Sequence, residues 1–201
     1  MTESAFHNKR QLTREDILPL GEYAAIRRER RSRIAETKRQ RRVEVGPFAT
    51  FYFENYDTMW FQVQEMLHIE KGGAAQLEEE LAAYNPLIPQ GMELVATVMF
   101  EIDNAAHRAA MLAQLGGIES HMFVELAGGR IRGEADPTRE NTSPQGKASS
   151  VQFVRFPFTA DQIARFRTPG ARIIVGFDHP SYGHMTVLPE PVRAALAKDF
   201  D

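Results

Sequence analysis

The residues MELVATVMFEI (92–102) decide how this chain folds. Apolar side chains run through this stretch almost without interruption, whereas a strand with one face in water alternates apolar and polar residues. The pattern therefore predicts a central strand that is covered on both faces. Its apolar part, Leu94 to Phe100, is the longest in the chain and is far too short to span a bilayer.

The segments on either side of this strand predict further strands and several helices. Runs rich in β-branched and aromatic residues predict strands at 43–55, 121–126, 130–135, 149–157, 171–177 and 182–188. Helical spacing of apolar residues predicts helices at 56–71, 74–84, 104–115, 160–167 and 189–200. We therefore expect a single α+β domain, with a mostly antiparallel sheet of about seven strands and flanking helices. An open sheet and a barrel-like one both fit the pattern.

The amino-acid composition excludes several classes of protein and of functional site. A chain of 201 residues with 43% hydrophobic and 25% charged residues fits a globular domain with a sizeable core. The absence of cysteine excludes disulfides, thiolate metal sites and a cysteine nucleophile. The first residues, MTESAFHNKRQ, lack the apolar segment of a signal peptide, so we expect a cytoplasmic protein that does not bind a membrane.

Charge is distributed unevenly along the chain. Residues 1–42 carry 12 Lys and Arg against 6 Asp and Glu, whereas residues 43–201 carry 12 against 21. Most of the basic excess lies in the run RRERRSRIAETKRQRR, residues 27–42. Helix formers continue there without Gly or Pro. We therefore expect a long basic N-terminal helix within a segment 1–42, which precedes the α+β domain 43–201.

Two functions are open to this basic segment. A cationic helix can contact the phosphates of a nucleic acid. Alternatively, its arginines pair with carboxylates of the same chain, of a second copy or of a partner protein. The second hypothesis is favoured, because the run contains neither base-stacking aromatic residues nor a known DNA-reading motif. The residues expected to bind a partner are Arg27, Arg28, Arg31, Arg39 and Arg42.

The local motifs of several large enzyme classes are missing. The sequence contains no G-x-x-x-x-G-K-[ST], no G-x-G-x-x-G after a strand, no G-x-S-x-G and no H-E-x-x-H. An enzyme site would therefore have to be assembled from distant segments. Three groups of residues are candidates for such a site.

The first group is Glu65 and His68, which share one face of the predicted helix 56–71. The E-x-x-H spacing supplies ligands in ferritin-like di-iron bundles, but here it occurs once and in a strand-rich chain. A mononuclear metal site with ligands from elsewhere is one interpretation. A solvated helix face with a local Glu–His pair is the simpler one.

The second group is Asp178, His179 and His184 in the segment DHPSYGH. One carboxylate and two imidazoles can bind a transition metal or act as acid and base. Asp, Pro, Ser and Gly are also the residues that a turn requires, so a structural turn is the simpler interpretation. The candidate metal ligands are Glu65, His68, Asp178, His179 and His184.

The third group consists of charged residues that interrupt apolar strands. Glu54 and Glu101, placed against Arg155, would line a ligand pocket at one edge of the sheet. Outward alternation on half-exposed strands is the simpler interpretation and is favoured by the period-two pattern. With the helical carboxylate included, the candidate ligand-binding residues are Glu54, Glu65, Glu101 and Arg155.

Three segments carry a resemblance to a known family. They are LTREDILPLGEYAAIRRERRSRIAETKRQRRVEVGP, FENYDTMWFQVQEMLHIEKG and the ending DHPSYGH…LPEPVRAALAKD. Over nearly its whole length the chain resembles the uncharacterised bacterial family known as domain of unknown function 3501. That family has no established activity, so the resemblance implies no catalytic residues. It implies a role beside rubrerythrin-like and iron–sulfur oxidoreductases, and a basic residue as often as histidine at position 68.

Taken together, these features lead us to expect a cytoplasmic binding or accessory protein. We expect it to form a homo-oligomer and to act with a redox protein of a non-haem-iron or iron–sulfur system. A metal-dependent enzyme with a His and carboxylate site is the first alternative. Nucleic-acid binding through the Arg-rich helix is the second.

Overall fold

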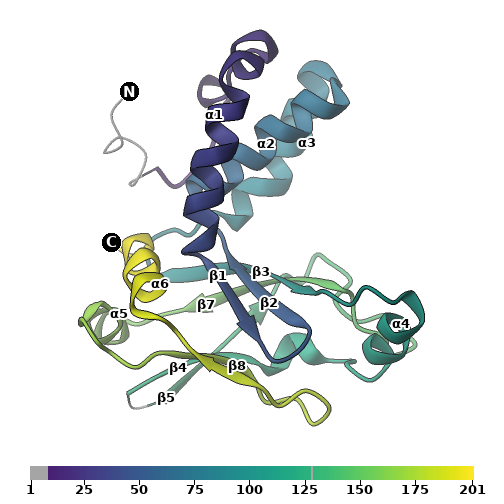
Figure 1. Ribbon diagram of the computed structural model, residues 1–201, viewed down its shortest axis with the longest axis vertical. Helices are drawn as coiled ribbons and strands as arrows, with labels where there is room; N and C mark the ends of the chain where they lie inside the picture. The colour runs from purple at the N-terminus through teal and green to yellow at the C-terminus, as the bar shows by residue number, and fades with distance from the viewer. Residues whose placement is uncertain (1–8, 128) are drawn as a thin grey trace.

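The computed structural model describes residues 9–127 and 129–201, which form a helical lobe above a sheet lobe (Figure 1). The helical lobe consists of α1 (Leu20–Arg39), α2 (Tyr56–Glu70) and α3 (Gly73–Tyr84). Contacts join α1 to α2 and α2 to α3, so that α2 lies between the two other helices. Each end of α2 follows from its sequence: the Asn55 side chain accepts a hydrogen bond from the Thr58 amide, and Lys71 ends the helix in a left-handed conformation.

The sheet lobe contains two antiparallel sheets, with strand orders β1-β2-β3-β7-β6 and β5-β4-β8-β9. In the described residues the strands are β1 (Arg42–Val45), β2 (Ala49–Phe53), β3 (Glu93–Phe100), β4 (Met122–Leu126), β5 (Gly129–Arg132), β6 (Glu134–Ala135), β7 (Val151–Pro157), β8 (Ile174–Phe177) and β9 (Met185–Val187). The α+β class is confirmed. The expected number of strands was too low, because two predicted strands are each divided in two.

Both divisions occur at glycine. The predicted strand 43–55 is a hairpin, in which Val45 pairs with Ala49 and Gly46 turns the chain with a positive φ of 70°. The predicted strand 130–135 bends at Gly133 and passes from one sheet to the other. A Cβ at Gly133 would lie 2.4 Å from Cγ2 of Val154, so the close approach of the two strands requires glycine.

The central position of β3 is confirmed. It pairs with β2 on one side and with β7 on the other. Leu94 and Val98 are buried in the core between the two sheets, whereas Val95 is buried in a second cluster beneath the helical lobe. The nearly continuous apolar run therefore reflects a strand with a packed layer on each face.

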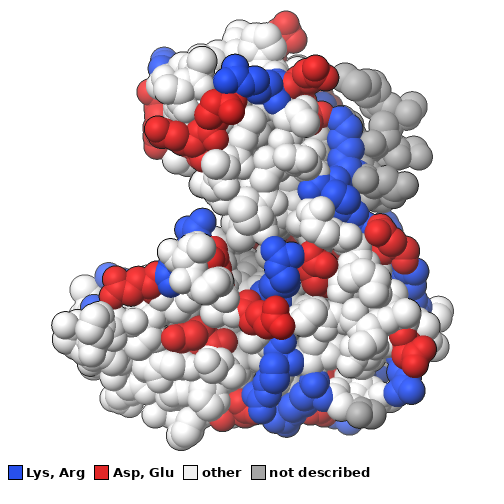
Figure 2. Space-filling view, turned by 180° about the vertical axis from the view of Figure 1, so that it is seen from behind, with Lys and Arg blue, Asp and Glu red and all other residues white. Residues whose placement is uncertain are grey.

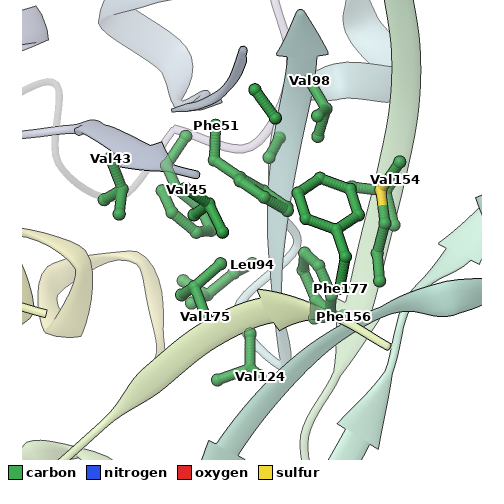
Figure 3. Close-up of a cluster of buried hydrophobic side chains, with 14 of the residues drawn as sticks. Val43, Val45, Phe51, Leu94, Val98, Val124, Val154, Phe156, Val175 and Phe177 are labelled. Atoms are coloured by element: carbon green, nitrogen blue, oxygen red, sulfur yellow. The ribbon is translucent and has the colours of Figure 1, made fainter. Parts of the chain in front are cut away.

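The main core lies between the two sheets. Figure 3 shows side chains from both sheets pointing toward each other, among them Phe51 and Phe156 of one sheet and Phe177 of the other. The ring of Phe51 lies 5.1 Å from that of Phe177 and 6.3 Å from that of Phe156, measured between centroids. Each fully buried phenylalanine stabilises the fold by roughly 1.5–3 kcal/mol.

The two sheets approach each other at both edges without closing into a barrel. At one edge the chain crosses at Gly133, whose amide donates to the carbonyl of Met122 at 2.9 Å. At the other edge Thr186 of β9 donates its hydroxyl to the carbonyl of Glu44 at 2.8 Å, but the two strands form no ladder. Of the two alternatives left open by the sequence, the structure has separate, open sheets.

Three further helices lie at the ends of the sheet lobe. α4 (Ala105–Ala113) lies at one end, and α5 (Ala160–Arg167) and α6 (Glu190–Leu196) lie at the other (Figure 1). Within the residues described, none of the helices combines the length and the hydropathy needed to cross a bilayer.

Arg41 joins the two lobes. Its side chain is buried between the end of α1 and the start of β1, where it pairs with Asp199 of the last turn, η5 (Ala197–Asp199). Its Nε also donates to the carbonyl of Phe53 at 2.8 Å, and its Nη2 donates to the carbonyl of Glu54 at 3.0 Å. One guanidinium thus connects α1, the junction of β2 with α2, and the C-terminal segment.

Replacement of this buried arginine is expected to destabilise the whole fold. The Arg41→Met variant removes the cation that faces the buried Asp199 carboxylate, which costs about 3–5 kcal/mol of the free energy of unfolding. Urea denaturation measures this loss. The matched control is Arg39→Met, whose exposed pair with Glu36 contributes less than about 1 kcal/mol. Equal losses in the two variants would contradict this role of Arg41.

Candidate functional site

Helix α1 provides most of the cationic surface of the helical lobe. It contains seven Lys and Arg against three Glu, and Tyr23 is its one buried residue. The helix begins directly after Pro19 and continues to Arg39 without another glycine beyond Gly21. Because so little apolar surface is available, α1 is held against α2 mainly by polar and aromatic contacts.

Glu65 of α2 is the centre of these contacts. Its Oε1 accepts hydrogen bonds from the Tyr23 hydroxyl at 2.6 Å and from Arg27 Nε at 2.8 Å. Its Oε2 accepts a further bond from Arg27 Nη2 at 2.8 Å, which completes a two-point guanidinium–carboxylate pair. The Tyr23 ring also packs edge-on against Trp60 and His68, with centroids 6.0 Å and 5.9 Å away.

The face of α2 that carries Glu65 and His68 is therefore not a solvated surface. Helix α1 covers it, and the Glu65 side chain is only 14% exposed. The simpler interpretation drawn from helical spacing was wrong on this point, because spacing within one helix does not reveal which other helix packs on it. His68 contacts the Tyr23 ring instead of forming a local pair with Glu65 in solvent.

The same contacts shift the ionisation of both groups. The hydrogen bonds from Arg27, helped by the Tyr23 hydroxyl, lower the pKa of Glu65 to about 2 against the opposing effect of burial. Burial and the neighbouring Glu65 carboxylate raise the pKa of Tyr23 well above its usual value. Glu65 is consequently ionised, and both its oxygens are engaged, at neutral pH.

Four of the remaining cations of α1 fall into two sets. Arg30 and Lys38 lie over aromatic rings of α2, at 5.1 Å from the Trp60 centroid and 5.7 Å from the Phe61 centroid. Arg28 and Arg31 are exposed, and the Arg31 charge still helps to lower the pKa of Glu65. Arg30 and Lys38 therefore contribute to the packing of α1 against α2, whereas Arg28 and Arg31 are exposed to solvent.

Arg39 and Arg42 lie at the base of α1, on an open groove. Arg39 pairs with Glu36 at 2.6 Å. Arg42 pairs with Glu44 at 2.9 Å, lies 3.9 Å from the Glu101 carboxylate and covers the Tyr52 ring at 5.7 Å. The groove has a volume of about 680 Å³, and we call it the α1 groove; it is lined by Ala35, Lys38, Arg39, Arg42, Val43, Glu44, Tyr52, Thr186 and Pro189.

The predicted ligand-binding group does not converge on one pocket. Glu54 is buried and accepts hydrogen bonds from the hydroxyls of Thr58 and Thr97, each at 2.7 Å. Arg155 pairs at 2.5 Å with Glu93, a residue that no local sequence pattern marked as a candidate. Each of these carboxylates has its own partners, because the pairing register decides which neighbours meet.

Glu101 is likewise bonded within its own sheet. Its carboxylate accepts hydrogen bonds from the hydroxyls of Thr50 at 2.6 Å and Tyr52 at 2.9 Å. Both donors belong to β2, and Arg42 of β1 approaches from the same side. Glu101 is thus part of the rim near the α1 groove and does not face Arg155.

The DHPSYGH turn is held by local hydrogen bonds. The Ser181 amide donates to Nδ1 of His179 at 3.1 Å, and Nε2 of the same ring lies 3.3 Å from the Gly116 carbonyl. Both ring nitrogens of this buried histidine are therefore occupied by backbone groups. His184 packs on the ring of Tyr182, with centroids 4.6 Å apart.

Asp178 forms a separate cluster with basic side chains of neighbouring segments. It accepts hydrogen bonds from His121 Nδ1 at 3.1 Å and from Arg130 Nη1 at 3.2 Å, and it pairs with Arg132 at 2.6 Å. Burial alone would raise the pKa of Asp178, but Arg132 and His121 outweigh it and lower that pKa. His121 has no local sequence signal, because it meets Asp178 only through the pairing of β4 with β8.

These contacts bear on the candidate metal ligands. Across residues 9–127 and 129–201, no three His, Cys, Asp or Glu side chains are grouped so as to hold a metal ion. The helical pair Glu65 and His68 lies under α1, whereas Asp178, His179 and His184 belong to the turn after β8. A metal site would have to displace hydrogen bonds that the protein already makes.

Figure 2 shows the face opposite to that of Figure 1, with a constriction between the two lobes. Over the sheet lobe, Lys and Arg atoms form a band on this face in which Asp and Glu atoms are interspersed. Some arginines of the sheet lobe are paired with carboxylates, as Arg130 is with Glu125 at 2.6 Å and Arg155 is with Glu93, whereas Arg165 and Arg167 donate to backbone carbonyls. The cationic charge of this lobe is therefore partly neutralised where it lies.

Comparison with known proteins supports the fold. A crystal structure described as a novel protein of unknown function from Burkholderia pseudomallei K96243 is 36% identical in sequence, with a TM-score of 0.88. The match covers 95% of this chain and 100% of that one. No curated protein matches the chain.

Comparison with models of protein families also identifies the family of this chain. Residues 11–200 match the family described as "Protein of unknown function (DUF3501)". The chain belongs to this family, which confirms the resemblance inferred from its sequence. The description of the family states no activity.

Acidification tests the contact between α1 and α2. Glu65 has a folded-state pKa of about 2 against an ordinary value of 4.5, so its ionised form stabilises the fold above pH 4.5. That contribution is lost as the pH falls through this window toward about 2. The Glu65→Gln variant is expected to be less stable at neutral pH and to lose less stability on acidification than the wild type.

The measurement is the urea midpoint as a function of pH. Glu140→Gln serves as the control, because Glu140 is exposed in a loop of the sheet lobe. The control should follow the wild-type curve. A Glu65→Gln curve parallel to that of the wild type would show that the pair with Arg27 does not hold α1.

Proposed function

We propose that the protein is a cytoplasmic accessory protein that binds an acidic protein partner through the α1 groove. One observation carries the proposal: Lys38, Arg39 and Arg42 line the same open groove, and Glu44 is the one carboxylate in its lining. Glu36 and Glu101 lie beside the groove and pair with its arginines, but the lining itself is mainly cationic, which favours a partner that presents carboxylates.

The groove arginines are able to exchange their present partners. The side chains of Arg39 and Glu36 are 73% and 56% exposed, and those of Arg42 and Glu44 are 46% and 70% exposed. Exposed pairs of this kind contribute only about 0–1 kcal/mol, so an incoming carboxylate can replace the resident one at little cost. Arginine is suited to this exchange because its guanidinium binds a carboxylate at two points.

The charge pattern favours an acidic protein over a nucleic acid. Glu29, Glu36 and Glu44 interrupt the cations along α1 and the groove, so the surface offers separate cations and not the continuous cationic track that a phosphate backbone contacts. The Tyr52 ring is covered by the Arg42 guanidinium, and its hydroxyl is bonded to Glu101. No open aromatic face in the groove lining is therefore offered to a base.

A redox protein is the first partner to test. This choice rests on the resemblance, which implies neighbouring rubrerythrin-like and iron–sulfur oxidoreductases. The proposal assigns no redox chemistry to the chain itself. In this scheme the chain contributes the docking surface, and the partner contributes the chemistry.

Binding of a poly-glutamate peptide to the purified protein tests the proposal. The Arg39→Gln/Arg42→Gln variant should bind the peptide at least about tenfold more weakly than the wild type at low salt, since two charge-assisted pairs are lost. The control Lys147→Gln/Arg172→Gln removes the same charge from exposed sites elsewhere and should change binding by less than about threefold. Fluorescence anisotropy measures both.

Two outcomes would overturn the proposal. Equal weakening in the groove variant and the control would mean that binding depends on net charge rather than on the groove. Tighter binding of a DNA duplex than of the peptide at matched salt, lost in the groove variant, would favour the nucleic-acid alternative.

A further inference from the structure

The two outer helices of the helical lobe carry opposite charge. On α1, Arg28 and Arg31 are exposed, and no salt bridge joins either to a carboxylate within the part of the chain that the structure describes. On α3, Glu79 is exposed and Glu80 is half-buried, and within the same described part neither forms a salt bridge. Because α2 lies between α1 and α3, the two charges are at opposite edges of the lobe.

The charges of α1 are directed to one face of the lobe. Leu20, Arg28, Arg31 and Lys38 lie on one flank of α1 by helical spacing. Lys38 on this flank contacts Phe61 of α2, so the flank faces the same side as Phe61. Residues 9–19, the described part of the N-terminal segment, cover the other side of α2, where the carbonyl of Asp16 accepts a hydrogen bond from the Trp60 indole.

The charges of α3 are directed to the same face. Glu78 pairs at 2.5 Å with Arg14 of the N-terminal segment and thus marks the covered side of α3. Helical spacing places Glu79 on the opposite flank from Glu78, and Glu80 toward α2. The Arg28 and Arg31 edge and the Glu79 and Glu80 edge therefore border one face, which residues 9–19 leave open.

Apolar side chains lie between and beside these charged edges. Ile69 of α2 is 65% exposed and Leu20 of α1 is 42% exposed, which makes them two of the large apolar side chains exposed on the molecule. By helical spacing Ile69 lies on the same side of α2 as Phe61 and Glu65. We call the open surface formed by Leu20, Arg28, Arg31, Phe61, Ile69, Glu79 and Glu80 the polarised face.

We propose that the polarised face binds the same face of a second copy of this chain. A two-fold axis that runs parallel to α2, in the plane between the two copies, places α1 of one copy on α3 of the other, and the reverse. Arg28 and Arg31 then meet Glu79 and Glu80 twice, while Ile69 and Leu20 are removed from water. Any partner other than a second copy would need a surface with an acidic edge, an apolar centre and a basic edge in the matching order.

This interface is separate from the groove of the proposed function. The polarised face uses Arg28 and Arg31, whereas the α1 groove uses Lys38, Arg39 and Arg42. The dimer does not depend on the binding of an acidic partner. Failure of one proposal therefore leaves the other standing, and separate variants test them.

Charge reversal on the full chain tests the dimer. Sedimentation velocity should show a wild-type dimer at about 0.05 M salt that dissociates toward monomer at about 0.5 M salt, because the paired charges are screened. The Arg28→Glu/Arg31→Glu variant and the Glu79→Arg/Glu80→Arg variant should each raise the dimer dissociation constant at least about tenfold, because like charges then face each other.

Mixing the two variants is the decisive control. One variant has two acidic edges and the other has two basic edges, so an equimolar mixture should form a heterodimer with wild-type-like affinity. A misfolded variant would not recover in this way. The groove variant Arg39→Gln/Arg42→Gln should remain dimeric.

Three results would overturn the proposal. They are a wild type that stays monomeric at low salt, a dimer that persists in both reversal variants, and a mixture that fails to associate when both components are folded by circular dichroism. The binding of poly-glutamate by a monomeric wild type would leave the proposed function intact and reject the dimer alone.

Discussion

The Glu65 carboxylate is the contact on which the rest of the helical lobe depends. Helix α1 has one buried residue, so apolar packing alone cannot hold it on α2. Glu65 binds Arg27 at two points and also accepts the hydroxyl of Tyr23, which is that buried residue. At the other end of α1, the buried pair of Arg41 with Asp199 anchors the chain to the sheet lobe. These two ionic contacts set the position of every other cation on the helix.

This arrangement separates arginines that hold the fold from arginines that can bind a partner. Arg27 and Arg41 are committed to carboxylates of the same chain. The α1 groove and the polarised face use arginines that are exposed and weakly paired or that form no salt bridge with the residues described. Buried pairs are costly to break and exposed pairs are cheap to exchange, so the division follows from burial rather than from residue type.

The sequence was sufficient to predict most of the helices and strands. It was not sufficient to predict which side chains of different helices and strands contact each other. The apolar run around Val95 identified the central strand, and the helical spacing of apolar residues over 56–71 identified α2, because both signals are local. Arg41 and Arg42 are adjacent and chemically identical, yet only Arg41 is buried, against a carboxylate 158 residues away. The pairs of Glu65 with Arg27 and of Asp178 with His121 are likewise set by packing and strand register, which no local pattern encodes.

Solvent exchange of the arginine Nε–H protons, followed by NMR, tests most directly the division between structural and available arginines. The account predicts slow exchange for Arg27 and Arg41, because their Nε–H groups donate to Glu65 and to the Phe53 carbonyl. It predicts fast exchange for Arg28 and Arg31 in the monomer, since both are exposed. Exchange at Arg27 as fast as that at Arg28 would contradict it, because α1 would then not be fixed by its ionic contact with α2.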